Sequence, residues 1–213
     1  MKEIYDFLTD LRKNNNRAWF DNNRDRYKET KEQFEVLTQE IIMMLSKYNT
    51  EYALLNPKDC IFRIFRDVRF SHDKSPYKPN YAAFIALGGK KGQAPGYYFH
   101  FEPGNCTLGG GVFRPERDEL KIIRERIYAS PDDFMNIIEK PSFRKVFPKL
   151  FDEGKLKMGP KGFPKDFEHI DLLKYKSYIV STYLTDEELL SADLMYTLEK
   201  RFKVIKPFND FLK

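Results

Sequence analysis

The stretch NYAAFIALGGKKGQAPGYYFHFEPGNCTLGGGVF, residues 80–113, contains three apolar runs at 80–88, 96–102 and 106–113, separated by short segments rich in glycine and proline. A fourth strand candidate, CIFRIFRDVRF at residues 60–70, comes just before them, with apolar and charged residues alternating. Runs of this length between turn residues predict β-strands. Short links connect antiparallel neighbours, because parallel pairing needs a crossover of a dozen or more residues. The sequence therefore predicts an antiparallel meander of about four strands.

Helical periodicity lies on both sides of this block of strands. Apolar residues recur three and four positions apart in 4–11 and 21–48 before it, and in 116–128, 132–139 and 186–208 after it. Residues 141–165 are interrupted by prolines and glycines, which predicts loop and turn. Helices that flank a central antiparallel sheet indicate an α+β fold. Because no segment resembles a linker, we expect residues 1–213 to form a single domain.

The composition limits the class of protein. Of the 213 residues, 41% are hydrophobic and 15% aromatic, which is too apolar for a disordered chain. We expect no membrane partner and no export, because no apolar run reaches membrane-spanning length and the first residues lack the pattern of a secretion signal. Two cysteines, Cys60 and Cys106, are too few for a disulfide scaffold and fit a reducing cytoplasm, where we expect both to be free and buried.

The net charge of +5 is concentrated in two regions. Lysines are in excess over carboxylates in residues 141–178, where a solvated surface is the simpler interpretation. Residues 60–79 hold two aspartates and a larger set of cations, namely Arg63, Arg66, Arg69, Lys74 and Lys78. A local excess of cations attracts anions or acidic surfaces. This second region is therefore the stronger candidate for a binding site.

If residues 60–70 form a strand, alternation places Arg66 on a face that is otherwise apolar. A guanidinium in that position must pair with a protein carboxylate or with a ligand anion, since an unpaired buried charge is costly. On the opposite face, Asp67 stands close enough to orient Arg63 or Arg69. The alternative is a structural network of ion pairs.

The strand leads into the polar loop SHDKSPYKP, residues 71–79, in which two prolines restrict the backbone. Hydroxyl, ammonium and backbone N–H groups can share the oxygens of a phosphate or carboxylate. We therefore predict an anion-binding site formed by Arg63, Arg66, Asp67, Arg69, Ser71, Lys74, Tyr77 and Lys78. The alternative is a tight surface crossover whose polar residues satisfy only their own backbone.

The segment RIFRDVRFS, residues 63–71, followed by Asp73-Lys74 and Pro76-Tyr77-Lys78, resembles the signature of a bacterial family called domain of unknown function 2461. Similarity to this family extends over nearly the whole chain and includes Phe7-Leu8, Asn15, Trp19-Phe20, Tyr27, Gly109–Gly111, Pro115 and Pro160–Phe163. The resemblance implies a single-domain layout and a cytosolic setting, and it implies no reaction. It also implies that Arg66, Asp67, Arg69, Ser71, Asp73, Lys74, Tyr77 and Lys78 form the characteristic patch of the family.

Evidence for catalysis is sparser. Tyr98, His100 and Glu102 share one face of the strand at 96–102, and a histidine beside a carboxylate can act as a general base. His100 and Asp73 are the candidates for an acid or base, although a hydrogen-bonded structural histidine is the commoner case. The three histidines are scattered without zinc-ligand spacing, so we expect no metal site and no cofactor. The run Gly109-Gly110-Gly111 leaves room for a ligand on the sheet.

The leading hypothesis is a cytosolic protein with a preformed pocket for a small molecule that carries a phosphate or carboxylate group. One alternative is a nucleic-acid binding module, which would also use the lysines of 141–178 and a sheet rich in aromatic residues. The other is a structural protein in which the Arg/Asp motif is only a network that specifies the fold. The sequence does not decide whether the protein is an enzyme.

Overall fold

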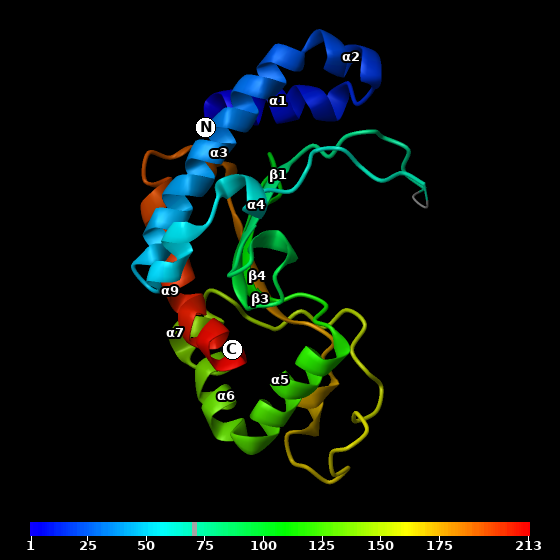
Figure 1. The fold of residues 1–213 in the computed structure, drawn as a ribbon, viewed down its shortest axis with the longest axis vertical. Coiled ribbons are helices and arrows are strands. Elements are labelled where there is room, and N and C mark those ends of the chain that lie inside the picture. Colours follow the sequence, from blue (N-terminus) through cyan, green and yellow to red (C-terminus); the bar gives the residue numbers. More distant parts are fainter. Residues whose placement is uncertain (70–71) are drawn as a thin grey trace.

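The computed structural model describes residues 1–69 and 72–213 and contains a four-stranded antiparallel sheet (Figure 1). Its strands are β1 (Tyr81–Ile85), β2 (Gly96–Phe101), β3 (Cys106–Val112) and β4 (Tyr178–Leu184), arranged in the order β1-β2-β3-β4. The predicted α+β fold with an antiparallel meander is confirmed. Three of the predicted strands are present, and the fourth strand comes from a different part of the chain.

The predicted strand at 60–70 is wrong. Residues 57–60 form the short helix α4 (Pro57–Cys60), and residues 61–69 make only two isolated bridges, Ile61 to Ala83 and Phe65 to Tyr77. The segment that faces 61–69 contains Pro76 and Pro79, which have no N–H to donate to a ladder. Residues 61–69 and 72–79 therefore leave the edge of the sheet as an irregular segment, visible at the right of Figure 1, and we call these residues the arm.

Strand β4 completes the sheet from far along the chain. Its sequence, YIVSTYL, buries Tyr178, Val180 and Leu184 on one side. It pairs with β3, so that Gly109 lies opposite Ser181 and Gly111 lies opposite Ile179. The alternation in this segment is the ordinary strand signal, with one face against the core and one face away from it.

The N-terminal helices are α1 (Lys2–Lys13), α2 (Arg17–Asn22) and α3 (Arg24–Ser46), followed by a short 3-10 helix, η1 (Thr50–Leu54). The carboxamide oxygen of Asn16 accepts the N–H of Trp19 and caps the start of α2. The predicted helix at 21–48 is present as α3, and Asn23 separates it from α2, which ends at Asn22. α1 packs beside α3 at one end of the molecule (Figure 1).

The helices after the meander are α5 (Arg117–Ala129), α6 (Pro131–Ile138), α7 (Pro141–Arg144), α8 (Asp186–Leu190) and α9 (Leu194–Leu212), with the 3-10 helices η2 (Gly89–Lys91) and η3 (Ile170–Lys174). The predicted helix at 186–208 is divided in two. Thr185 begins α8 with a capping box, in which its hydroxyl accepts the N–H of Glu188 and the Glu188 carboxylate accepts the N–H of Thr185.

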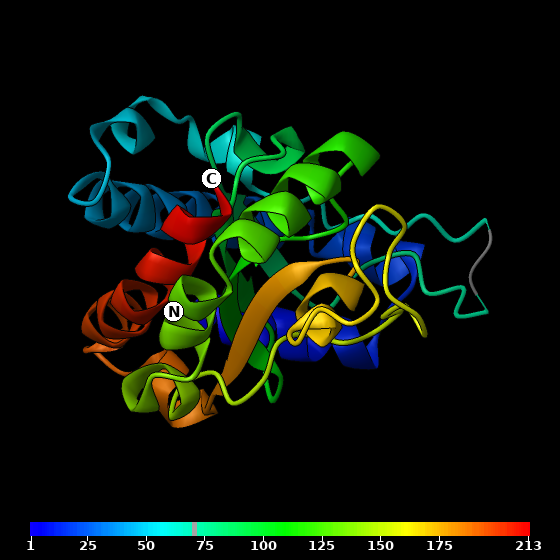
Figure 2. The same ribbon diagram turned by 90° about the horizontal axis from the view of Figure 1, so that it is seen from below.

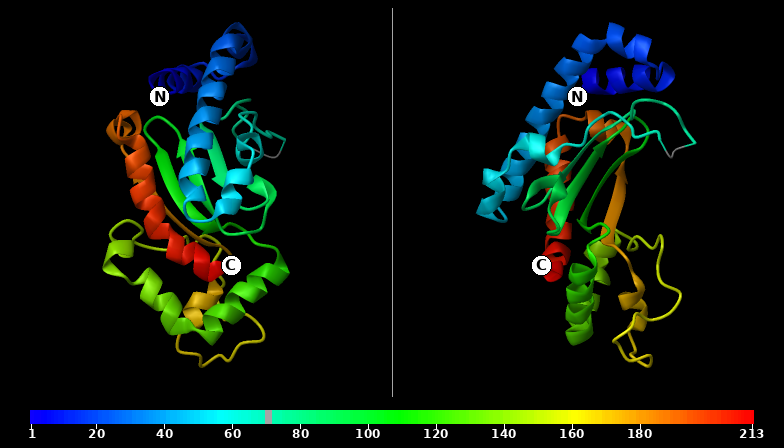
Figure 3. Two further views of the ribbon diagram at one scale, coloured as in Figure 1. Left: turned by 60° about the vertical axis from the view of Figure 1, so that its left-hand side comes forward. Right: turned by 45° about the vertical axis from the view of Figure 1, so that its right-hand side comes forward.

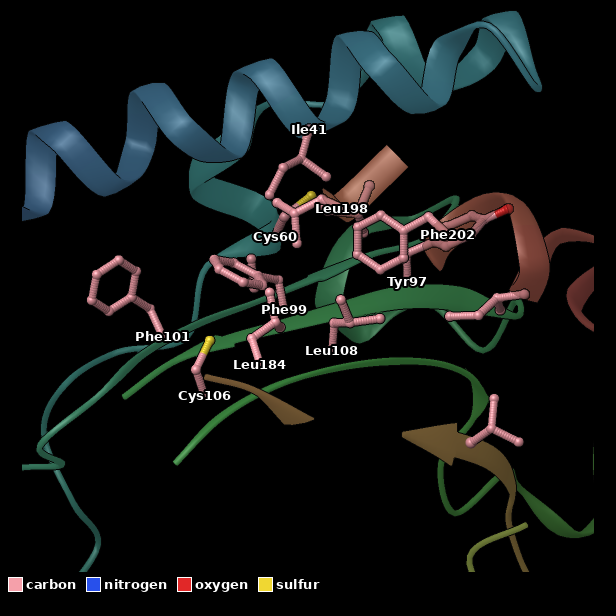
Figure 4. Close-up of a cluster of buried hydrophobic side chains, with 14 of the residues drawn as sticks. Ile41, Cys60, Tyr97, Phe99, Phe101, Cys106, Leu108, Leu184, Leu198 and Phe202 are labelled. Carbon is pink, nitrogen blue, oxygen red and sulfur yellow. The ribbon is translucent and has the colours of Figure 1, made fainter. Parts of the chain in front are cut away.

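Helices α3 and α9 cover one face of the sheet (Figures 2 and 3). Apolar side chains fill the space between them, and Figure 4 shows Ile41 of α3 above Phe99 of β2 and Phe202 of α9 beside Tyr97 of the same strand. A Cβ atom on Gly110 would lie 2.6 Å from Cγ2 of Ile205, so glycine at this position lets α9 approach β3 closely. The other face of the sheet is turned away from these two helices.

No helix within residues 1–69 and 72–213 combines the length and the apolar character needed to cross a lipid bilayer. Both cysteines in this part of the chain are free and buried, as predicted.

Candidate functional site

A cavity of about 860 Å³ lies on the face of the sheet that α3 and α9 do not cover. The register explains which side chains reach it, because Tyr98 pairs with Gly109 and His100 pairs with Thr107 across β2 and β3. Residues on every strand contribute to its walls, together with parts of the arm and the segment after β1; those used below are Phe62, Lys78, Phe84, Lys90, Lys91, Tyr98, His100, Thr107, Gly109, Gly110, Gly111, Phe113, Phe151 and Ser181.

The floor of the cavity is the glycine run of β3. Gly109 and Gly111 occupy positions at which a side chain would stand on this face. Because glycine has no side chain, the backbone of β3 is exposed to the cavity at these positions. Gly111 has φ of +115°, and a Cβ atom there would lie 2.0 Å from the carbonyl oxygen of Tyr178. Glycine is therefore required by the backbone at position 111, and the open floor is a consequence.

Aromatic rings stand at two places around this floor. The ring of Phe62 packs edge-on against Tyr98, with centroids 6.4 Å apart, and Phe113 packs edge-on against Phe151 at 6.5 Å. Phe62 and Phe113 remain 37% and 54% exposed, so both rings present apolar surface that nothing in the described chain covers completely. Apolar walls with a few polar groups are typical of small-molecule sites.

Lys78 supplies a cation to the cavity. Its ammonium donates to the carbonyl oxygen of Arg63 at 3.0 Å. Burial lowers the pKa of Lys78, and the positive charges of Arg63 and Arg66 lower that pKa further. Lys90 donates instead to the carbonyl oxygens of Lys58 and Asp59 at the end of α4. The surroundings of Lys78 therefore disfavour its charged form.

Three side chains of β2 and its C-terminal end form a hydrogen-bonded chain beside the glycine floor. Nε2 of His100 lies 2.8 Å from Oε2 of Glu102, and Nδ1 of His100 lies 3.0 Å from the hydroxyl of Tyr98. An ionised carboxylate only accepts, so the imidazole donates from Nε2 and accepts the Tyr98 hydroxyl proton at Nδ1. Arg12 also contacts Glu102, at 3.1 Å. Burial raises the pKa of Tyr98 to about 12.

The arm holds most of its charges in pairs. Arg66 pairs with Asp73, and Arg69 donates to both oxygens of Asp67 at 2.7 and 2.9 Å. The ammonium of Lys74 donates to the carbonyl oxygen of Val68 at 3.0 Å. The hydroxyl and backbone N–H of Ser75, followed by Arg66, lower the pKa of Asp73 to about 2. These contacts shape the arm internally.

The structure thus separates the predicted site residues. Lys78 of the arm and His100 of β2 line the cavity, whereas the other predicted residues of the arm do not, namely Arg63, Arg66, Asp67, Arg69, Asp73 and Lys74. Arg66 is not on the apolar face of a strand, and its partner is a protein carboxylate. The Tyr77 ring is buried in a stack on Phe20, and the expected hydroxyl contact of Tyr77 stays a prediction. Ser71 lies outside the described residues.

The sequence interpretation missed the aromatic walls and the β4 side of the cavity. Phe113 and Phe151 are far apart in the chain, and only the fold brings them together. Ser181 could have been found, since alternation in YIVSTYL places it on the face opposite Val180. His100 was recognised from its spacing to Glu102, and the hydrogen bond between them is present.

Comparisons with known proteins give a family and no activity. Among the described residues, no group of three or more histidine, cysteine or acidic side chains is placed to hold a metal ion. No curated protein and no solved structure gives a significant match to the chain. A family model does match, over residues 3–211. The chain therefore belongs to the family described as "Conserved hypothetical protein (DUF2461)".

Proposed function

We propose that the cavity on the uncovered face of the sheet binds a small molecule that carries a phosphate or carboxylate group. The observation that carries this proposal is the position of Lys78 at the wall of an otherwise mainly apolar cavity of about 860 Å³. This volume is within the range of small-molecule sites. The apolar part of the molecule would contact Phe62, Phe113 and the glycine floor.

The surroundings of Lys78 favour an anion as its ligand. Its ammonium is close to two other cations, Arg63 and Arg66, and it is partly removed from water. A bound anion would offset both effects, because it supplies the opposite charge that the local protein groups lack. Phosphate and carboxylate oxygens accept hydrogen bonds from an ammonium, and an ion-assisted hydrogen bond is stronger than a neutral one.

The first prediction concerns Lys78→Met, which keeps the length of the side chain and removes its charge. We expect phenyl phosphate and benzoate to raise the melting temperature of the wild-type protein, with a stabilisation of about 2.7 kcal/mol at 100 times the dissociation constant. Lys78→Met should lose this response. The measurement is a thermal melt at constant ionic strength, with phenol as the neutral comparison.

Two further lysine variants locate the effect. Lys200→Met removes an exposed charge on α9, which lies on the other side of the sheet from the cavity. This variant should respond like the wild type. Lys74→Met removes a charge of the arm that does not line the cavity. If Lys74→Met loses the response and Lys78→Met keeps it, the anion binds to the arm and the proposed cavity site is wrong.

The second prediction is the pH dependence of benzoate binding. Lys78 is charged below its pKa, which lies below the usual lysine value, and benzoate stays ionised throughout the alkaline range. Affinity should therefore fall as the pH rises through the lowered pKa of Lys78, before an ordinary lysine loses its charge. Calorimetric titrations at a series of alkaline pH values test this. An affinity that is constant over the series would exclude Lys78 as the anion-binding group.

A nucleic-acid partner is the alternative outcome of the same assays. Binding of a short single-stranded oligonucleotide that weakens steeply with salt, and that depends on the lysines of 141–178, would favour it. The ion pairs of the arm support a structural role for the Arg/Asp motif, whichever partner the cavity binds. We place the protein in the cytoplasm, since Cys60 and Cys106 are both free thiols.

A further inference from the structure

We propose that Tyr98, His100 and Glu102 make the cavity a catalytic site, in which the Tyr98 hydroxyl is an activated nucleophile and His100 takes its proton. The inference rests on the proposed function in one respect, because the substrate is the small molecule bound in the same cavity. It goes further by assigning a reaction class, the transfer of an electrophilic group such as an acyl or phosphoryl group.

The direction of the hydrogen bonds supports this assignment. Glu102 accepts from Nε2 of His100 at 2.8 Å, which leaves Nδ1 as the free base of the imidazole. The partner of Nδ1 is the Tyr98 hydroxyl at 3.0 Å. A nucleophile, a base and a carboxylate that orients the base, each within hydrogen-bonding distance of the next, are the arrangement that nucleophilic catalysis requires.

The position of Tyr98 and His100 in the cavity also supports the catalytic assignment. Tyr98 and His100 both line the cavity, and Tyr98 lies opposite Gly109, whose missing side chain leaves space beside the phenol ring. Glu102 is held from the other side by Arg12 and by Asn105, whose carboxamide donates to it at 2.9 Å. The carboxylate is thus fixed by the protein, and Tyr98, at the other end of the hydrogen-bonded chain, lines the cavity.

The step balances within the site. The Tyr98 oxygen forms a bond to the electrophilic carbon or phosphorus of the bound molecule, and the bond to the leaving group breaks with its electron pair. The hydroxyl proton moves to Nδ1 of His100, and the resulting imidazolium is stabilised by the Glu102 carboxylate. The imidazolium then gives this proton to the leaving group, which departs in its neutral form and leaves His100 as a base again. Water then attacks the tyrosyl ester, which releases the group as an acid and returns Tyr98 to its hydroxyl form. The phenol is not required to ionise beforehand, which suits its raised pKa.

Labelling with aryl sulfonyl fluorides tests the activation directly. The phenol oxygen attacks sulfur, the S–F bond breaks, fluoride leaves, and the proton must be taken by a base. Benzenesulfonyl fluoride is the neutral probe, and 4-(fluorosulfonyl)benzoate carries a carboxylate as well. Mass spectrometry gives the rate at each tyrosine, and the exposed Tyr183 and Tyr196 serve as references within the same molecule.

We expect Tyr98 to be labelled faster than Tyr183 and Tyr196. Burial alone would make Tyr98 the slowest of the three, so faster labelling requires a base. His100→Gln keeps a polar side chain and should slow the labelling of Tyr98 by about 100-fold, the lower end of a general-base contribution. Glu102 is a positioning residue, and Glu102→Gln should lower the ratio of Tyr98 to Tyr183 labelling while Glu102→Asp partly restores it. Glu40→Gln removes an exposed carboxylate of α3, on the other side of the sheet, and should leave the ratio unchanged.

The outcomes separate the two proposals. If benzenesulfonyl fluoride labels Tyr98 no faster than Tyr183, or if His100→Gln does not change the rate, the catalytic inference is overturned even where anions bind. If 4-(fluorosulfonyl)benzoate has no advantage over the neutral probe and Lys78→Met has no effect on it, the anion site fails while the activation of Tyr98 stands. Loss of the Tyr98 advantage together with unchanged melting of His100→Gln excludes unfolding as the cause.

Discussion

Gly111→Ala is expected to destabilise the protein by about 4 kcal/mol or more, a loss that few single methyl additions cause. Two effects combine at this position. The backbone has φ of +115°, a conformation that residues with a Cβ atom rarely adopt. The added Cβ would also lie 2.0 Å from the carbonyl oxygen of Tyr178 and 2.9 Å from Cα of Ile179, so strands β3 and β4 would have to separate. Chemical denaturation measures the change in the free energy of unfolding.

Gly104→Ala is the matched control for this prediction. Gly104 also has a positive φ, of +72°, but nothing lies within 4 Å of the position of its Cβ. The substitution should therefore cost only the backbone term of about 1–2 kcal/mol. If Gly111→Ala costs no more than Gly104→Ala, the close approach of β3 to β4 is not required for folding, and the account of the glycine floor is wrong.

Phe20→Ala is expected to cost about 3–5 kcal/mol, the usual range for removing a large buried aromatic side chain. Phe20 is only 2% exposed, and its ring stacks on Tyr77 with centroids 3.9 Å apart. It also contacts Tyr27 of α3, at 5.0 Å, and Phe65 of the arm, at 6.0 Å. The substitution therefore removes the contact that joins the N-terminal helices to the base of the arm. The free energy of unfolding is again the measurement.

Tyr77→Phe distinguishes the two roles considered for Tyr77. The structural role depends on its ring and on its backbone, which exchanges hydrogen bonds with the carboxamide of Asn15. We therefore expect Tyr77→Phe to change stability and anion binding little. A strong loss of benzoate binding in Tyr77→Phe would instead support the hydroxyl contact that the sequence predicts.

For Phe20→Ala, a loss of unfolding free energy below about 1 kcal/mol would show that the arm does not depend on the stack of Phe20 on Tyr77.

Local patterns in the sequence predicted much of the fold. The three strands of the meander follow from apolar runs bounded by glycine and proline, and the flanking helices follow from their apolar spacing. The segment 60–70 has the same alternation, and its described residues 60–69 still form no regular strand. These residues do not form a ladder because the segment opposite contains prolines, which have no N–H to donate to one. Strand β4 has the same local alternation, but its pairing with β3 could not be predicted because β3 precedes it by more than sixty residues.

The site was predictable only in part, because some of its contacts join residues that are far apart in the sequence. The pairing of His100 with Glu102 follows from their positions two residues apart on one strand, which alternation places on one face. The arginines of the arm formed the strongest cluster of charge in the sequence, yet most of that charge is paired within the arm. The cavity itself depends on which face of the sheet α3 and α9 cover, and no local pattern in the sequence gives this information.

The most direct test of the central claim is an NMR titration of the ¹⁵N-labelled protein with phenyl phosphate. The amides of Gly109, Gly110 and Gly111 report on the floor of the cavity, and those of residues 63–69 and 72–77 report on the part of the arm outside the cavity. The account predicts saturable shifts at the three glycines and at Ser181, which Lys78→Met abolishes. Shifts confined to the arm or to the lysines of 141–178, or no shifts at all, would contradict it.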